Sequence, residues 1–119
     1  MATVLVVDDD AAIRLLLTRW LKKHQFDVDQ ASDGVEAVER IESNPPHVIL
    51  LDIMMPRMNG FGVVAHLKKT RPSLLRRTIV MTAAPRDAER ELEGICKLVP
   101  KPFEMQMMLD TIRACSLAA

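Results

Sequence analysis

The sequence has no surplus of charge of either sign, because 16 lysines and arginines balance 16 aspartates and glutamates in a chain of 119 residues. Proteins that bind nucleic acids or anionic membranes by overall electrostatic attraction usually carry an excess of basic side chains. The balance therefore argues against direct binding of nucleic acid or of a membrane surface as the main activity.

Long apolar runs and cysteines are scarce as well. The run at residues 4–7 is too short for the hydrophobic region of a signal peptide, and the other long apolar run is interrupted by Asp52. The two cysteines, Cys96 and Cys115, predict free thiols in a reducing compartment, because no signal peptide is recognisable. We therefore expect a cytoplasmic protein with no membrane-spanning segment.

Apolar material, by contrast, is plentiful, since 49% of the residues are hydrophobic and 27% are charged. A chain of this size and composition can bury a core without cross-links. No linker or internal repeat divides it. We expect residues 1–119 to form one domain, with no output domain in this chain.

Short apolar segments rich in β-branched residues alternate with segments whose apolar residues recur at helical spacing. The predicted strands cover residues 3–7, 26–31, 47–51, 78–81 and 97–99. The predicted helices cover residues 11–23, a segment capped by Ser32 or Asp33 that ends before Asn44, and residues 61–70, 86–93 and 103–116. This alternation predicts an α/β fold, a doubly wound five-stranded parallel sheet with helices on both faces.

Polar residues stand at the carboxyl ends of four predicted strands. Asp8 and Asp9 follow the first strand, Asp52 the third, Thr82 the fourth and Lys101 the fifth. Ligands of open parallel sheets bind outside these ends, so we expect the four strand ends to form one site. Asp10, the next residue after the acidic pair, is better interpreted as the N-cap of the first helix.

The residue types in this group indicate a particular chemistry. Carboxylates that share one crevice repel one another unless a cation lies between them, and a set of oxygen ligands without histidine or cysteine favours Mg2+. The Thr82 hydroxyl and the Lys101 ammonium group suit the oxygens of a phosphoryl group. A carboxylate that attacks an anionic donor needs such electrostatic support. The pattern therefore predicts an aspartyl phosphate.

Five short segments, each at a strand end or a turn, carry a family resemblance. They are Val6-Val7-Asp8-Asp9, Leu51-Asp52-Ile53-Met54-Met55-Pro56, Asn59-Gly60, Thr82-Ala83 and Lys101-Pro102-Phe103. With these segments the chain resembles the receiver domain of two-component response regulators over essentially its full length. The resemblance implies a flavodoxin-like fold with five helices and the strand order 2-1-3-4-5.

The resemblance also implies roles for the acidic residues. Asp52 would accept the phosphoryl group, from a sensor histidine kinase, a phosphotransfer protein or a small donor such as acetyl phosphate. Mg2+ would be bound by Asp9, by Asp52 and by the backbone carbonyl of Met54, with Asp8 acting mainly through water.

The remaining site residues would bind the phosphoryl oxygens and transmit the change. Thr82 and Lys101 would hold these oxygens, helped by backbone N–H groups near Met54 and Ala83. Movement of Thr82 would then alter a surface. The partner that binds this surface would be an unknown downstream protein, an output domain or a second copy in a homodimer. The domain would not be a turnover enzyme, since it would catalyse only its own phosphotransfer and dephosphorylation.

Two departures from the family pattern concern the transmission of the change from Thr82 to the surface. Leu98 stands where the family usually has tyrosine or phenylalanine, and the chain contains no tyrosine. The stretch from Thr82 to Lys101 is also shorter than usual by about one helical turn. We expect a truncated helix at residues 86–93 and an altered coupling between Thr82 and Leu98.

Two other functions are compatible with parts of the pattern. A haloacid-dehalogenase-type phosphatase also uses an aspartyl phosphate, and residues 8–12 offer part of its motif but lack the last residue. A receiver-shaped interaction module that no longer depends on phosphate would agree with Leu98 and the short helix, but not with the complete acidic site.

Overall fold

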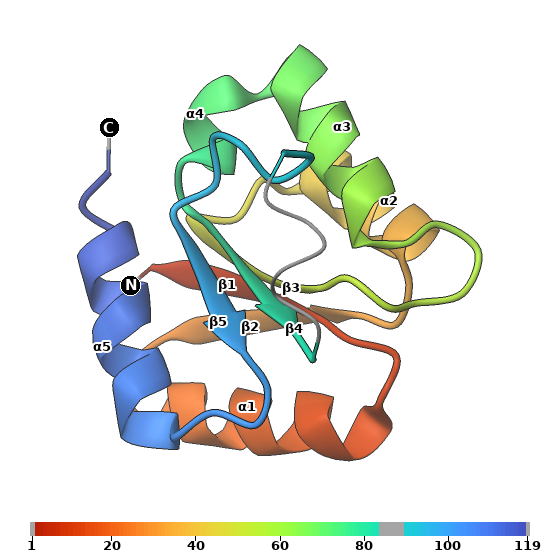
Figure 1. The fold of residues 1–119 in the computed structure, drawn as a ribbon. Coiled ribbons are helices and arrows are strands. Elements are labelled where there is room, and N and C mark those ends of the chain that lie inside the picture. The colour runs from red at the N-terminus through yellow and green to blue at the C-terminus, as the bar shows by residue number, and fades with distance from the viewer. Residues whose placement is uncertain (1, 84–89, 119) are drawn as a thin grey trace.

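Five parallel strands form one sheet in the computed structural model of the chain (Figure 1). They are β1 (Thr3–Val7), β2 (Asp27–Ala31), β3 (Val48–Asp52), β4 (Thr78–Thr82) and β5 (Lys97–Pro100). Their order in the sheet is β2-β1-β3-β4-β5. The structure describes residues 2–83 and 90–118. The predicted doubly wound sheet and its strand order are confirmed.

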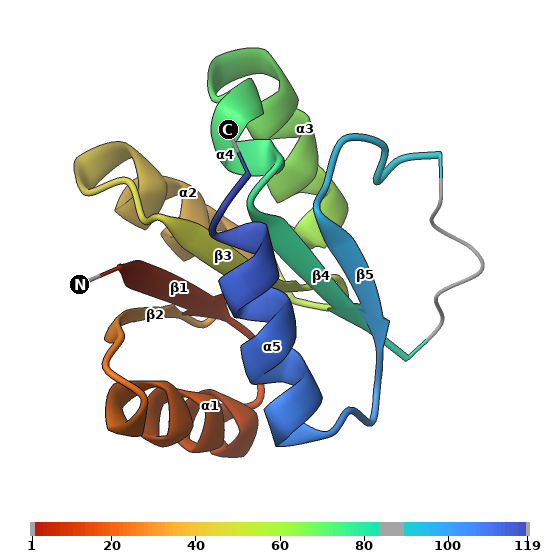
Figure 2. The ribbon, with the colours of Figure 1, turned by 90° about the vertical axis from the view of Figure 1, so that its left-hand side faces the viewer.

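Helices cover both faces of the sheet (Figures 1 and 2). One face carries α1 (Ala11–Lys23) and α5 (Met105–Cys115). The other carries α2 (Gly34–Ser43), α3 (Gly60–Thr70) and α4 (Pro72–Leu75). Among the described residues, no helix has the length and apolar character needed to cross a membrane.

The central strands are buried on both faces, which explains their continuous apolar runs. In β1, Leu5 and Val7 pack in the cluster that includes the apolar faces of α2 and α3, whereas Val4 and Val6 pack against α1 and α5. Successive side chains of a strand point to opposite faces, so one five-residue run contributes to two cores. All five residues of β3 and of β4 are buried in this way.

Three helices begin at a side-chain cap. Asp10 accepts hydrogen bonds from the backbone N–H groups of Ala12 and Ile13, as the sequence predicted. Asp33 accepts one from Glu36, which decides between the two predicted caps of α2. The same role falls to Asn59 at the start of α3. These caps fix the directions in which the helices leave the strand ends, and so they help to position the site.

The fourth helix differs from the prediction. Residues 86–89 of the helix expected at 86–93 lie outside the described residues, and the described residues 90–94 form turns. A one-turn helix, α4, which the sequence analysis did not predict, lies directly after α3. Pro72 occupies its first turn, and Leu74 and Leu75 are buried. Four residues are too few to show a helical period, which is why the pattern did not reveal it.

The cysteines also differ from the prediction of free thiols. Cys96 and Cys115 form a disulfide, with 5.9 Å between their Cα atoms, and they are 19 positions apart in sequence. Cys96 directly precedes β5 and Cys115 ends α5, so the two sulfur atoms meet only once α5 has packed on the sheet. Spacing along the chain could not indicate this contact.

A close backbone approach makes Gly34 the least replaceable described glycine. Its N–H donates to the Met58 carbonyl oxygen at 2.9 Å, and a Cβ there would lie 2.1 Å from that oxygen. We expect Gly34→Ala to lower the free energy of unfolding by about 3 kcal/mol, because backbone on both sides must shift. Urea denaturation followed by circular dichroism measures the change.

Gly62→Ala is the matched control for this substitution. Its added Cβ would meet the Met58 side chain, 2.5 Å from Cγ, which can rotate away, and alanine favours the interior of α3 by about 1 kcal/mol. We expect its stability to stay within about 1 kcal/mol of wild type. Equal losses in both variants would contradict the explanation.

Candidate functional site

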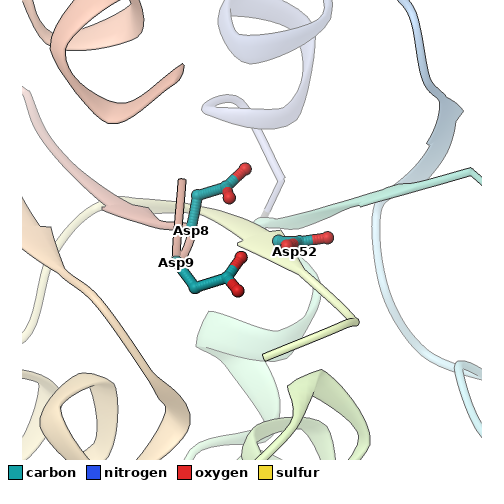
Figure 3. Close-up of side chains that lie close together, drawn as sticks. All are labelled: Asp8, Asp9 and Asp52. Atoms are coloured by element: carbon teal, nitrogen blue, oxygen red, sulfur yellow. The ribbon is translucent and has the colours of Figure 1, made fainter. Parts of the chain in front are cut away.

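Three aspartates come together where β1 and β3 end. Asp8 and Asp9 follow β1 and Asp52 is the last residue of β3, and carboxylate oxygens of all three lie within 4.8 Å of one another (Figure 3). Asp8 is fully buried, Asp52 is 4% exposed, and Asp9 is exposed. The cluster therefore has two carboxylates inside the protein and one at the opening.

The strand register explains why residues 44 positions apart meet. β1 and β3 are adjacent and parallel, and Val7 lies opposite Leu51. The next residue on each strand is an aspartate, so Asp8 and Asp52 occupy the same level of the sheet edge. A shift of one residue in this register would separate the carboxylates.

Lys101 approaches the two buried carboxylates from the loop between β5 and α5. Its Nζ lies 3.1 Å from Asp8 Oδ2 and 3.4 Å from Asp52 Oδ1. Its backbone N–H donates to the Thr82 carbonyl oxygen at 2.8 Å, which holds the loop against the end of β4. One ammonium group thus partly neutralises two carboxylates.

The incomplete neutralisation is visible in the pKa of Asp52, which is raised from 3.8 to about 6. Burial is the largest cause and the negative charge of Asp8 is the second, while Lys101 and the backbone N–H of Met54 act in the opposite direction. For Lys101, burial lowers the pKa, but its hydrogen bond to Asp8 and the charges of Asp52 and Asp8 outweigh it, so the pKa is raised. The negative charge of the site is therefore only partly compensated.

Thr82 belongs to the same edge of the sheet. It is the last residue of β4, it is 3% exposed, and its strand neighbour Met81 lies opposite Asp52 on β3. Ala83 follows it at the surface. The predicted phosphate-binding position Met54 follows β3 by two residues, and its side chain is 73% exposed.

Leu98 lies deeper in the sheet than the acidic cluster. It pairs with Val80 of β4 and packs against the core cluster that contains Val80. Side chains two apart on a strand share a face, so Thr82 and Val80 point to the same side. Leu98 is thus on the Thr82 side of the sheet, where it offers packing but no hydroxyl group.

The sequence did not indicate what holds the loop after Asp52. Arg57 in this loop has a φ of 62°, which is uncommon for a residue with a side chain. Its guanidinium group binds Asp33 Oδ2 at 2.8 Å through both Nε and Nη2. The pKa of Asp33 is lowered, first by the Glu36 N–H and also by Arg57. This ion pair joins the loop after β3 to the start of α2.

The arrangement suits two kinds of chemistry. Three carboxylates with no histidine or cysteine among them fit a hard divalent cation such as Mg2+. A carboxylate beside such a cation and beside Lys101 can attack an electrophile that bears anionic oxygens, because the positive charges offset the repulsion. Asp52 is the only member of the cluster that lies at the end of the fully buried central strand β3.

Comparisons with known proteins show relatives over most of the chain. Residues 4–113 match the model of a family described as the response regulator receiver domain. Two proteins named response regulator MprA, from Mycobacterium sp. (strain KMS) and Mycobacterium ulcerans (strain Agy99), are each 40% identical to the chain over 114 residues. The matches cover 93% of this chain and 49% and 48% of those proteins, so the chain spans about half the length of these relatives.

Solved structures are similar over nearly the whole chain. Response regulator protein TrrA from Thermotoga maritima, in complex with Mg(2+)-BeF, has a TM-score of 0.88 and 27% identity, with 97% of this chain and 99% of that chain covered. Chemotaxis response regulator CheY4 of Vibrio cholerae has a TM-score of 0.86 and 28% identity, with 97% and 98% covered.

Proposed function

The chain belongs to the response regulator receiver domain family, a family of two-component signalling domains, and from this membership we propose that Asp52 accepts the phosphoryl group. The observation that carries the proposal is the raised pKa of Asp52 beside Asp8, Asp9 and Lys101. Lys101 offsets only part of the negative charge of the three aspartates, and a divalent cation would offset more of it.

Mg2+ would be held by Asp9, Asp52 and the Met54 carbonyl oxygen, with Asp8 acting through water. When bound, the ion supplies positive charge that offsets repulsion between the Asp52 carboxylate and an anionic donor. Asp8 also accepts a hydrogen bond from Lys101, so it orients the ammonium group toward Asp52.

The other polar residues would bind the transferred group. Lys101 would donate to one phosphoryl oxygen and the Thr82 hydroxyl group to another, with backbone N–H groups near Met54 and Ala83 completing the set. Charge-assisted hydrogen bonds of this kind are about twice as strong as neutral ones. The phosphoryl group would thereby draw the ends of β3, β4 and β5 together.

Partners follow from the same chemistry. The donor would be the phosphohistidine of a sensor histidine kinase or phosphotransfer protein, in the cytoplasm, or a small molecule such as acetyl phosphate. The recipient of the signal would be a downstream protein, an output domain or a second copy of the chain. The domain would act without direct nucleic-acid or membrane binding, and it would not turn over external substrates.

The test is phosphoryl incorporation. Incubation with acetyl phosphate and Mg2+ is expected to add one phosphoryl group per chain, and chelation of the metal with EDTA to reduce the rate at least about a hundredfold. Intact-mass spectrometry measures both. Continuous hydrolysis of phosphate esters would instead revive the haloacid-dehalogenase alternative, whose motif at residues 8–12 lacks its last residue.

Metal binding should depend on pH in a way that identifies Asp52. Its raised pKa means that protons compete with Mg2+ below about pH 6. Affinity for Mg2+ should therefore fall about tenfold between pH 7 and pH 5. Calorimetric titration measures it, and Asp52→Asn should remove most of the dependence. A midpoint near pH 4 would contradict the raised pKa.

Leu98 favours a second candidate, a receiver-shaped module whose surface does not respond to phosphate. Hydrogen exchange with and without Mg2+ and beryllofluoride, a phosphoryl mimic, separates the two. Slower exchange in β5 and α5 on addition of the mimic supports coupling to Asp52. Slower exchange confined to the residues around the carboxylates supports the uncoupled module.

A further inference from the structure

The disulfide between Cys96 and Cys115 lies outside the acidic site, at the opposite end of β5. Cys96 directly precedes β5, whereas Lys101 directly follows it. The closed ring formed by the disulfide contains all of β5, the Lys101 loop and all of α5. Figure 2 shows α5 lying across the sheet, with its first turn nearer the carboxyl end of β5 and its last turn toward the opposite end.

The two cysteine residues differ in exposure. Cys115 is 2% exposed, while Cys96 is half-buried. Both pack in the cluster between the sheet and the helices α1 and α5, together with Val99, Met108 and Ile112. A reduced cysteine behaves as a small apolar side chain, so the same cluster also accommodates two thiols. The core therefore does not need the covalent bond in order to form.

A disulfide of this kind is informative in a cytoplasmic signalling domain, the location given under the proposed function. Glutathione and thioredoxin keep most cytosolic thiols reduced, and cytosolic disulfides of mesophiles are mostly transient, catalytic or redox-sensing. A pair that is close enough to bond, that the core tolerates in both forms, and that has one partly exposed cysteine meets the requirements for reversible exchange.

We propose that Cys96 and Cys115 form a reversible redox site that accepts oxidising equivalents from low-molecular-weight disulfides. The Cys96 thiolate attacks the small disulfide, forms a mixed disulfide and releases one thiol. The Cys115 thiolate then attacks the Cys96 sulfur atom and releases the second thiol. Two protein thiols are oxidised and one small disulfide is reduced to two thiols, with the protons passing to the released thiolates.

Oxidation should restrain α5 without altering the phosphoryl acceptor. The bond ties the last residue of α5 to the residue before β5, at the end of the helix where the Ser116 carbonyl oxygen lies 2.8 Å from His47 Nε2. Asp52, Asp8 and Lys101 lie at the other end of the strands. Redox state would thus act on the α5 surface independently of phosphorylation.

The experiment titrates the full chain with reduced and oxidised glutathione. Free thiols are alkylated and the products are weighed by mass spectrometry, while hydrogen exchange is followed in α5. We expect one intramolecular disulfide, and at least tenfold slower exchange over residues 112–116 in the oxidised form. Persistence of two alkylatable thiols in oxidised glutathione, or equal exchange in both forms, would overturn the proposal.

Single variants test the order of attack. In Cys115→Ser the more accessible Cys96 should accumulate the mixed disulfide, whereas in Cys96→Ser the buried Cys115 should react at least tenfold more slowly. Equal rates would overturn the assigned order. Both measurements are repeated on Asp52→Asn, whose redox behaviour should match wild type, so failure of the redox site and failure of the phosphoryl acceptor remain distinguishable.

Discussion

Replacing Asp52 by asparagine is expected to abolish phosphoryl incorporation while making the metal-free protein more stable. The amide is a poor nucleophile, so the rate of modification by acetyl phosphate should fall at least a hundredfold, a barrier increase of about 2.7 kcal/mol or more. The asparagine would keep the size of the side chain and one acceptor oxygen. One variant is therefore expected to lose phosphoryl incorporation and to gain stability.

The gain in stability follows from the pKa of Asp52. The pKa is about 6 in the folded protein against 3.8 for the free group, so ionisation favours the unfolded chain. The protonated Asp52 side chain contributes its full share to the free energy of unfolding below about pH 4, and this contribution is lost as the pH rises through about 6. The full shift corresponds to about 3 kcal/mol, and solvent at the edge of the site reduces it to about 2 kcal/mol at pH 7.

Urea denaturation at pH 7 and pH 4 in the presence of EDTA measures this difference. The advantage of Asp52→Asn should be about 2 kcal/mol at pH 7 and should nearly vanish at pH 4. Asp10→Asn is the matched control, because Asp10 is an exposed cap and asparagine caps equally well. A stability gain that persists at pH 4, or undiminished labelling of Asp52→Asn, would refute the assignment.

Replacing Lys101 by methionine is expected to weaken phosphoryl transfer and to strengthen metal binding. The substitution removes the ammonium group that lies 3.1 Å from Asp8 and 3.4 Å from Asp52. Loss of a positioned donor to developing charge costs about a hundredfold in rate. Without that positive charge the carboxylates attract Mg2+ more strongly, and we expect about tenfold tighter binding.

Stability should respond to the same loss. Two buried carboxylates without their cation are expected to cost about 2 kcal/mol at pH 7 without metal, less than for a fully buried pair because the Lys101 side chain is 21% exposed. Saturating Mg2+ should restore most of the lost stability. Lys97→Met, an exposed position on β5, is the control. It should not appreciably change the rate of phosphoryl transfer, the affinity for Mg2+ or the stability. Weaker Mg2+ binding in Lys101→Met would contradict the electrostatic explanation.

Much of the fold could be predicted because its signals are local. Runs such as the one ending at Val7 marked strands buried on both faces, and Asp10 marked a helix start. The element boundaries shifted by only one or two residues in most cases, for example from residues 47–51 to Val48–Asp52. Five residues of the candidate site could be grouped for the same reason, since each stands at the end of a predicted strand.

Other features could not be predicted because they depend on contacts between distant segments. The ion pair of Asp33 with Arg57 joins two loops 24 residues apart. Helix α4 is stabilised by the burial of Leu74 and Leu75 and has no period of its own. The sequence predicts free cysteines because no signal peptide is recognisable, whereas the pairing of Cys96 with Cys115 depends on the packing of α5 on the sheet.

The sequence by itself therefore determined the order of strands and helices and the residue types at each strand end, because periodicity and caps are properties of neighbouring residues. Only the tertiary structure decided the charge balance of the site, the ion pair that holds the loop after Asp52 and the pairing of Cys96 with Cys115. Desolvation, ion pairing and disulfide formation all depend on distances through space, and those distances exist only after the sheet has assembled.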